Sequence, residues 1–391
     1  MHDNLHGPNA TSSIPTLAQR RMEGLVRVKP APGDPGDKDI SGCAIAGICC
    51  QDRQRIGGAE IIACIATMHD RSNGLGGGFA AYGIYPDRPD QYALHVMYES
   101  EAARGQTEAY LGGIFHILHQ ETIPTRPVAV IRDRPLFQRY FVLPTEGARR
   151  RYYDHDDNDL VVMAVMHVNV QIDGAFVFSS GKDCGVFKGV GYPEDIAQFF
   201  RLEEYEAHTW ISHGRFPTNT SGWWGGAHPF GILDWTVVHN GETSSYGTNR
   251  RYLANFGYSC ALHTDTEVVT YLVDLLMRKH KLPVELACQA FAPPFWEQIE
   301  RMPEDEARLS RAIRQIYGPA LLNGPFSILV GFSGGMIALN DRIKLRPSTA
   351  AVKGKRVYVA SEESAIRAIC PQPERIWQLD GGQPLVARLE N

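Results

Sequence analysis

The chain carries eight cysteines, and Cys43 is the one whose surroundings could make it a nucleophile. The eight are scattered and form no C-x-x-C pair, which favours buried, reduced thiols over a disulfide framework. A cysteine nucleophile needs a base, and no histidine partner stands out near Cys43 in the sequence. An N-terminal cysteine could use its own α-amine, which titrates near roughly pH 8 and is partly neutral at cellular pH. This chemistry requires cleavage of the Gly42–Cys43 bond.

The stretch before Cys43 has the composition of a leader. Residues 1–42 are polar and rich in proline and glycine, so they can bury little apolar surface. Residues 43–50 are apolar and predict a buried strand. We therefore predict a flexible leader over residues 1–42 that is removed, followed by a catalytic domain over residues 43–391. His2 and His6 do not make a metal site, and we expect no metal in this chain.

Composition excludes several classes of protein. Hydrophobic residues make up 43% of the 391 residues and charged residues 21%, as in a globular protein with a large core. The net charge of −5 gives no sign of a nucleic-acid surface. Because no apolar run of about 18 residues and no signal-peptide core occur, we expect no membrane span and a cytoplasmic location.

The elements that must position a site can be read coarsely from apolar spacing and from breaker residues. Helices are predicted within 58–69 and 107–119, after the capping-box pattern Thr264-Asp-Thr-Glu267, and over 284–317 with breaks at its prolines. A glycine-rich turn is predicted over 71–78. Strands are predicted over 79–85, 160–170, 175–179, 207–213, 235–239, 326–332, 336–340 and 356–360. This order favours stacked antiparallel sheets covered by helices.

Several segments together resemble a known family. Residues 43–48 resemble the opening of class II glutamine amidotransferases, and 212–219 (SHGRFPTN) resemble their arginine motif. Residues 227–230 and 237–242 resemble their oxyanion segment, and 264–267 resemble their substrate-amine motif. The segments follow the family's order. The resemblance implies an α+β fold, the four-layer αββα sandwich of N-terminal-nucleophile (Ntn) hydrolases.

The resemblance also implies a role for each matching residue. Cys43 would attack the side-chain carboxamide of L-glutamine, and its freed α-amine would carry the proton. The side chain of Asn240 and the backbone N–H of Gly241 would hold the oxyanion. Taken alone, however, Asn-Gly is an ordinary turn dipeptide.

Substrate recognition by the family needs a grip on both charged ends of a free amino acid. Arg215 would bind the α-carboxylate through a two-pronged hydrogen bond, which lysine could not copy. Asp265 would pair with the α-ammonium, and it is also a plausible helix-cap residue. Phe216, Thr218 and His228 match positions in the pocket wall, where we expect His228, like His239, to be structural.

Three further segments point to one subgroup of this family, because they are similar to segments of glutamate synthases. They are residues 239–249, 341–348 and 359–362. The chain looks most like the separate amidotransferase subunit of split, archaeal-type glutamate synthases. That likeness implies a partner flavoprotein subunit carrying FMN and an iron–sulfur cluster, with no cofactor in this chain. Three alternatives stay open: a glutaminase-like subunit of an N-methylglutamate synthase, an Ntn amidohydrolase acting on another amide without a partner, and a non-catalytic binding subunit that keeps its leader.

The sequence departs from the family pattern in three places, the first being Ala44 where the family usually has glycine after the cysteine. Residues 71–77 (RSNGLGG) lack the acidic and hydroxyl positions of the family's Arg-Gly-x-Asp-Ser-x-Gly, so Arg71 and Gly77 are only weakly assigned to the site. The long stretch between this turn and the arginine motif predicts an inserted lobe within about 86–200.

Overall fold

The computed structural model describes residues 42–216 and 222–390. Apart from Gly42, the expected leader lies outside the described residues, and so does Thr218. The leader and its removal therefore stay predictions. No helix in the two described ranges is long and apolar enough to span a bilayer.

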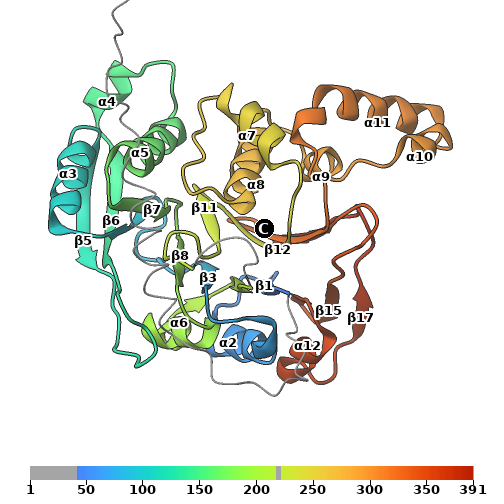
Figure 1. Cartoon of the computed structure of the whole chain (residues 1–391), viewed down its shortest axis with the longest axis horizontal. Helices are drawn as coiled ribbons and strands as arrows, with labels where there is room; N and C mark the ends of the chain where they lie inside the picture. Colours follow the sequence, from blue (N-terminus) through green and yellow to red (C-terminus); the bar gives the residue numbers. More distant parts are fainter. Residues whose placement is uncertain (1–41, 217–221, 391) are drawn as a thin grey trace, which may run out of the picture.

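Two antiparallel sheets form the centre of the molecule (Figure 1). The larger runs in the spatial order β17 (Arg375–Gln378), β15 (Thr349–Lys353), β16 (Arg356–Ala360), β1 (Ala44–Cys50), β10 (Thr209–Gly214), β3 (Gly77–Tyr82) and β8 (Cys184–Gly189). The smaller runs in the order β11 (Phe230–Ile232), β12 (Trp235–Gly241), β13 (Phe326–Phe332), β14 (Gly335–Asn340) and β18 (Leu385–Arg388). The larger sheet thus joins strands from both ends of the chain. A separate two-stranded ladder pairs β2 (Ile56–Gly57) with β9 (Glu206–Ala207).

The two large sheets pack face to face. A Cβ on Gly47 in β1 would lie 3.1 Å from the Leu329 side chain of β13 and would overlap Met336 of β14. At the edge of the contact, Tyr82 of β3 donates its hydroxyl proton to the carbonyl of Asp234, at 2.8 Å. Glycine in β1 therefore permits the close approach of the second sheet.

Helices cover both outer faces. On the larger sheet lie α2 (Ala59–Ala66), α6 (Pro193–Phe199) and α12 (Glu363–Ile369). On the smaller sheet lies α8 (Asp265–Val273), which continues into η3 (Asp274–Lys279). Helix α7 (Tyr246–Ala254) packs on α8, and α9 (Val284–Phe291) packs on η3. Figure 1 shows the resulting four layers, with two helical layers enclosing two sheets. The α+β, αββα sandwich expected of the Ntn class is confirmed.

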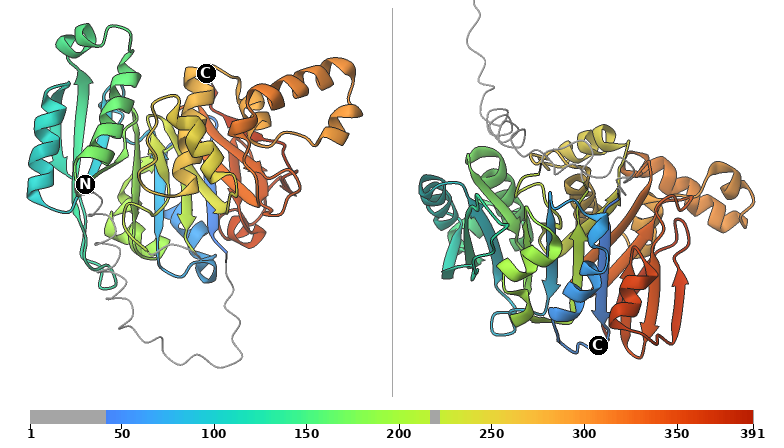
Figure 2. Two further views of the ribbon diagram at one scale, coloured as in Figure 1. Left: turned by 45° about the horizontal axis from the view of Figure 1, so that its top comes forward. Right: turned by 60° about the horizontal axis from the view of Figure 1, so that its bottom comes forward.

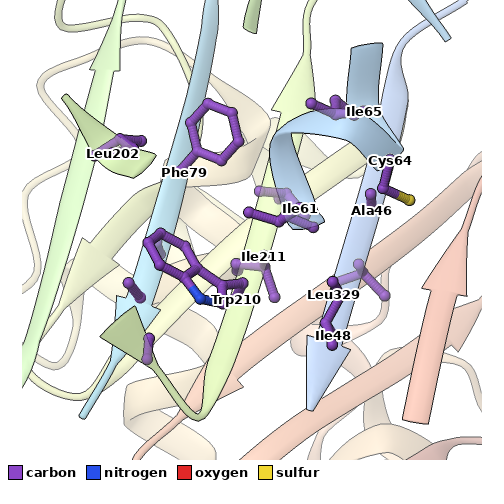
Figure 3. Packing of buried hydrophobic residues seen from close by; sticks show 14 of the residues in the cluster. Ala46, Ile48, Ile61, Cys64, Ile65, Phe79, Leu202, Trp210, Ile211 and Leu329 are labelled. Atoms are coloured by element: carbon purple, nitrogen blue, oxygen red, sulfur yellow. The ribbon is translucent and has the colours of Figure 1, made fainter. Parts of the chain in front are cut away.

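The packing of α2 explains why this segment is helical and lies where it does. Ile61 and Ile65 are four residues apart, so they share one helix face, which lies against the larger sheet. Figure 3 shows this face over Phe79 and Trp210 of the neighbouring strands. Trp210 is fully buried, and its indole N–H donates to the carbonyl of Ile56 at 3.2 Å. Helix α2 thus packs on β10, the strand that leads to Arg215.

A separate four-stranded sheet lies within the expected lobe. Its spatial order is β5 (Phe115–Thr122), β6 (Leu136–Pro144), β4 (Tyr92–Tyr98) and β7 (Ala175–Ser179), and its helices are α3 (Glu101–Gly112), α4 (Glu146–Arg151) and α5 (Asp157–Gln171). We call residues 92–179 the lobe. Although β8 and α6 also fall within 86–200, they belong to the sandwich. That the lobe is an insertion into the family domain stays a prediction.

Two expected elements in the lobe were wrong. The predicted strand over 160–170 is the helix α5, which begins after Asp156, whose side chain accepts the N–H of Asp159 at 2.8 Å. Its apolar residues are nearly continuous, and such a run does not distinguish a strand from a buried helix. The predicted helix over 107–119 begins earlier and stops at Gly112, and strand β5 follows.

The helices predicted over 284–317 are confirmed, with breaks at the prolines. They are α9, α10 (Trp296–Glu300) and α11 (Glu304–Ile316). In both views of Figure 2, the α10–α11 hairpin stands out from the body of the molecule.

Candidate active site

Cys43 lies directly before β1, at the end of the larger sheet. Ala44 pairs with Gly214, the last residue of β10, so Cys43 and Arg215 are brought to the same edge. The N–H of Phe216 points at the Cys43 sulfur, with nitrogen and sulfur 3.4 Å apart. Burial raises the pKa of the Cys43 thiol, while the Phe216 N–H and Arg215 oppose this rise. A base is therefore needed to generate the thiolate.

Exposure separates Cys43 from the other cysteines. All eight thiols are free, and Cys43 is half-buried whereas the other seven are buried. Burial raises the pKa of Cys49 to about 11 and that of Cys64 to about 12. Neither favours a thiolate at neutral pH, so accessibility favours Cys43 as the nucleophile.

Arg71 holds the main chain of Cys43. Its Nε donates to the Cys43 carbonyl oxygen at 3.2 Å, and its Nη1 donates to Oε1 of Glu362 at 2.9 Å. The residue that sequence assigned only weakly is therefore in contact with the nucleophile's backbone. Gly77 lies in β3, where a Cβ would come within 2.8 Å of the backbone nitrogen of Pro193, so its role is packing.

The glycine-rich turn positions Arg215. The Arg215 N–H donates to the carbonyl of Gly76 at 2.8 Å, and the Ser72 hydroxyl donates to the Arg215 carbonyl at 3.0 Å. A Cβ on Gly76 would approach Cδ of Arg215 to 3.0 Å, so a larger residue there would push the Arg215 side chain aside. The turn thus fixes the arginine beside the nucleophile.

Asn240 and Gly241 end β12 in the facing sheet. Asn240 is buried, and its Nδ2 donates to Oγ of Ser361 at 3.4 Å. The same oxygen accepts the N–H of Ile45, two residues after Cys43, at 3.0 Å. Ser361 thus ties the expected oxyanion donor to the nucleophile's strand. Gly241 has φ +148°, and a Cβ there would overlap the carbonyl oxygen of Pro325, so glycine is required.

Asp265 is the first residue of α8, after the cap Thr264, whose hydroxyl accepts the N–H groups of the first turn. Its Oδ2 accepts the N–H of Thr243 at 2.9 Å and the Thr243 hydroxyl at 3.3 Å. Nδ1 of His239 is 3.4 Å from Oδ1. Burial would raise the pKa of Asp265, but His239 and the Thr243 hydrogen bonds outweigh it and lower the pKa to about 2. The carboxylate is therefore ionised at any physiological pH.

Arg215, Asp265 and Cys43 act on one another electrostatically. Arg215 is only 7% exposed; burial lowers its pKa, while Cys43 and Asp265 oppose this shift. Arg215 lowers the pKa of the Cys43 thiol, whereas Asp265 raises it. A buried cation and a half-buried anion that both act on one thiol can hold the carboxylate and ammonium ends of a free amino acid.

Three buried basic side chains lie close to the site: His213, His228 and Lys188. We call them the basic layer. The rings of His213 and His228 stack with centroids 4.1 Å apart. Burial lowers the pKa of His213 to about 3 and places that of His228 well below the usual value. Both rings are neutral at pH 7, so neither suits proton transfer, as expected for His228.

Lys188 of β8 also belongs to this layer, although the sequence analysis missed it. Its Nζ donates to the carbonyl of Gly225 at 2.9 Å and lies 4.0 Å from the centroid of the Phe230 ring. Burial lowers its pKa to about 7, against the opposing charge of Glu267. The sequence marks this residue only as a lysine within an otherwise apolar strand, which indicates a buried charge.

The structure therefore brings together seven of the eight predicted site residues, and Thr218 lies outside the described residues. The sequence analysis also missed Ser361 and Thr243, which hold Asn240 and Asp265, and Arg346, which lowers the pKa of Cys43. These residues contact the site through pairings between distant parts of the chain, which no local sequence pattern marks. Within residues 42–216 and 222–390, no group of three or more histidine, cysteine and acidic side chains is arranged to hold a metal ion.

Comparison with known proteins gives consistent matches. The family model described as "Glutamine amidotransferases class-II" matches residues 130–390. A protein of Archaeoglobus fulgidus described as uncharacterized is 51% identical over 358 residues, covering 91% of this chain and 94% of its own. A putative glutamine amidotransferase of Methanothermobacter thermautotrophicus is 24% identical over 346 residues, covering 87% of this chain and 98% of its own.

One solved structure is a glutamine phosphoribosylpyrophosphate amidotransferase from B. subtilis complexed with ADP and GMP. It is 14% identical, with a TM-score of 0.42, and the match covers 88% of this chain. The chain spans only 49% of that longer protein.

Proposed function

The chain belongs to the class II glutamine amidotransferases, and on that premise we propose that it is the glutaminase subunit of a glutamate synthase-type enzyme. In this proposal Cys43, freed at its α-amine, hydrolyses L-glutamine to glutamate and ammonia. The ammonia passes to a separate flavoprotein subunit, which would carry the FMN and iron–sulfur cluster and aminate 2-oxoglutarate. The observations that support the hydrolytic step are that Cys43 is the half-buried thiol, that the Phe216 N–H lies 3.4 Å from its sulfur, and that the charges of Arg215 and Asp265 both act on its pKa.

Formation of the thioester begins with proton loss from the thiol. Because burial raises the thiol pKa, the α-amine of a mature Cys43 would take the proton as the sulfur attacks the carboxamide carbon. The negative charge that develops on the amide oxygen would be held by Asn240 Nδ2 and the Gly241 N–H. The same α-ammonium would then give its proton to the leaving ammonia.

Hydrolysis of the thioester completes the reaction. Water attacks the acyl carbon, the C–S bond breaks, and glutamate and the Cys43 thiol are regenerated. Arg71 holds the main chain at the Cys43 carbonyl, and the Ile45–Ser361 hydrogen bond holds it two residues further on. They would keep the new amine in place after Gly42 is removed, which supports the use of one residue as nucleophile and base.

The test combines the mature N-terminus with activity. Intact-mass analysis of active enzyme should find a chain that begins at Cys43, and Cys43→Ala should abolish glutaminase activity, measured as glutamate release. Cys49→Ala is the matched control and should stay active, because Cys49 is fully buried in β1. Active enzyme that begins at Met1, or an active Cys43→Ala variant, would exclude the mechanism.

Substrate class and pathway need their own assays. An amidohydrolase acting on simple peptides or acyl amides would have no use for both Arg215 and Asp265, so activity should be confined to glutamine and its close analogues. With the flavoprotein subunit added, glutamine should support glutamate formation from 2-oxoglutarate. Use of methylamine in that assay would instead indicate an N-methylglutamate synthase.

A further inference from the structure

Exposed aromatic and aliphatic side chains gather beside the α10–α11 hairpin. Phe295 and Trp296 are 38% and 49% exposed, and Ile343 and Leu345, on the loop after β14, are 58% and 56% exposed. The guanidinium of Arg342 lies 4.5 Å from the centroid of the Phe295 ring, which joins the loop to the hairpin. Such a patch on a soluble protein marks an interaction site.

Arginines stack on both rings. Besides Arg342 over Phe295, the Arg314 guanidinium lies 4.2 Å from the centroid of Trp296 and donates to the carbonyl of Pro294 at 2.5 Å. We call the surface made by Phe295, Trp296, Arg314 and residues 342–346 the cation–aromatic face.

The positive charge of this face is not neutralised within the described chain. None of the ion pairs among residues 42–216 and 222–390 involves Arg314, Arg342, Lys344 or Arg346. Asp341, the nearest acid in sequence, acts on Arg342 electrostatically, but its carboxylate oxygens accept backbone N–H groups of its own loop at 3.1 Å and of Phe326 at 3.3 Å and form no ion pair with the cations of the face. A partner that covers the face must therefore bring the carboxylates.

The face adjoins the catalytic edge of the smaller sheet. Gly241 pairs with Phe326 in β13, and the Phe326 carbonyl accepts the N–H of Asp341 at 2.8 Å. The loop of the face thus starts one strand away from the oxyanion segment. At its other end Arg346 lowers the pKa of the Cys43 thiol. A protein docked here would lie next to the site that releases ammonia.

We propose that the cation–aromatic face is the docking surface for an acidic, partly apolar surface of the ammonia-consuming flavoprotein subunit. This inference rests on the proposed function and deepens it. Aromatic residues and arginine dominate the binding energy of protein interfaces. A symmetric contact between two copies at this face would oppose cations to cations, so the face does not suit self-association. The projection of α10 and α11 from the body leaves the surface accessible (Figure 2).

The test uses the full chain and the recombinant flavoprotein subunit from the same genome. Arg314→Glu and Trp296→Ala should each weaken the complex about tenfold or more, measured by titration calorimetry at low and at 0.3 M salt. Arg308→Glu, on the same helix and 76% exposed at its side chain, is the matched control and should bind like the wild type. Arg314→Gln removes the charge without reversing it, and circular dichroism of each variant checks folding.

Activity separates docking from catalysis. In the Arg314 and Trp296 variants, glutamine-dependent glutamate formation should fall at limiting subunit concentration, while the glutaminase activity of the free chain and ammonia-dependent synthesis by the flavoprotein stay unchanged. If the wild type binds and couples but Arg314→Glu and Trp296→Ala do so equally well, the docking surface is wrong and the proposed function stands. If the wild type neither binds nor couples, both fall. A wild-type dimer dissociated by Trp296→Ala would overturn the proposal in favour of self-association.

Discussion

The catalytic sandwich and the lobe differ in how their charged side chains are compensated. In the sandwich, Lys188 is 1% exposed and contacts the Gly225 carbonyl and the Phe230 ring rather than a carboxylate. Asp265 lies 3.4 Å from Nδ1 of the buried His239. In the lobe, the cations pair with carboxylates: Arg104 pairs with Glu108, with side chains 27% and 30% exposed, and the buried Arg139 pairs with Glu121 at 2.6 Å. Burying a charge costs stability unless the charge is compensated, so we expect the sandwich to be less stable for its buried charges near the proposed ligand site. Substitutions at the proposed site residues of the sandwich should therefore change catalysis, and those in the lobe only stability.

The largest effect that sharpens this comparison is expected at Asn240. Asn240→Ala removes one of the two proposed oxyanion donors, and loss of one such donor lowers kcat by roughly 10²–10³-fold. Asn340→Ala is the matched control, because Asn340 lies in the same sheet and its side chain bonds Leu379 and Ser348 rather than the site. The control should lower the melting temperature and keep kcat. Comparable kcat losses in both variants, measured by glutamate release, would mean that Asn240 is only structural.

Local patterns were enough to predict the elements around Asn240. The strand at 235–239, the cap Thr264 and the proline breaks near 293 and 303 each depend on neighbouring residues, and the structure has β12, α8 and the α9–α11 series there. The expected capping box is only half formed. Glu267 accepts the N–H groups of Ala261 and Leu262 instead of reaching back to Thr264.

Contacts between residues far apart in the chain could not be predicted from the sequence. Ser361 meets Asn240 across a separation of 121 residues, and no local pattern marks that serine. Helix α5 was taken for a strand because its burial comes from the tertiary packing of the lobe, which hides helical periodicity. The sequence therefore predicts the chemistry of the site better than the contacts that hold it.

Arg215→Lys should show the next largest effect. Lysine keeps the charge but cannot form the bidentate fork, so KM for glutamine should rise about 10–100-fold with a smaller change in kcat. Arg278→Lys is the control, because Arg278 forms a similar fork with Asp274 outside the site. Its effect should be on stability alone. A normal KM in Arg215→Lys would remove Arg215 from substrate binding.

A moderate, pH-dependent effect is expected at Lys188. Its pKa is lowered to about 7 in the folded protein, so between pH 7 and its unfolded value near 10.5 the unfolded chain binds the extra proton. That difference makes wild-type stability rise with pH in this window. Lys188→Met removes the term, so the stability of the variant relative to the wild type should fall from pH 7 to pH 9, by up to about 1.4 kcal/mol per pH unit. Urea titrations at both pH values would show the trend, and a pH-independent difference would mean that Lys188 is charged throughout.

The smallest effect is expected in the lobe, at Arg104. Arg104→Ala removes a partly exposed pair with Glu108, for which about 0.5 kcal/mol of stability is typical, and it should leave kcat and KM unchanged. Glu108→Ala should destabilise the lobe more, because Glu108 also accepts the hydroxyl proton of the buried Tyr140 at 2.9 Å. Urea unfolding and glutamate release measured on the same samples test both statements. If Arg104→Ala changed KM for glutamine, the lobe would be coupled to the site, and the division between the two regions would be lost.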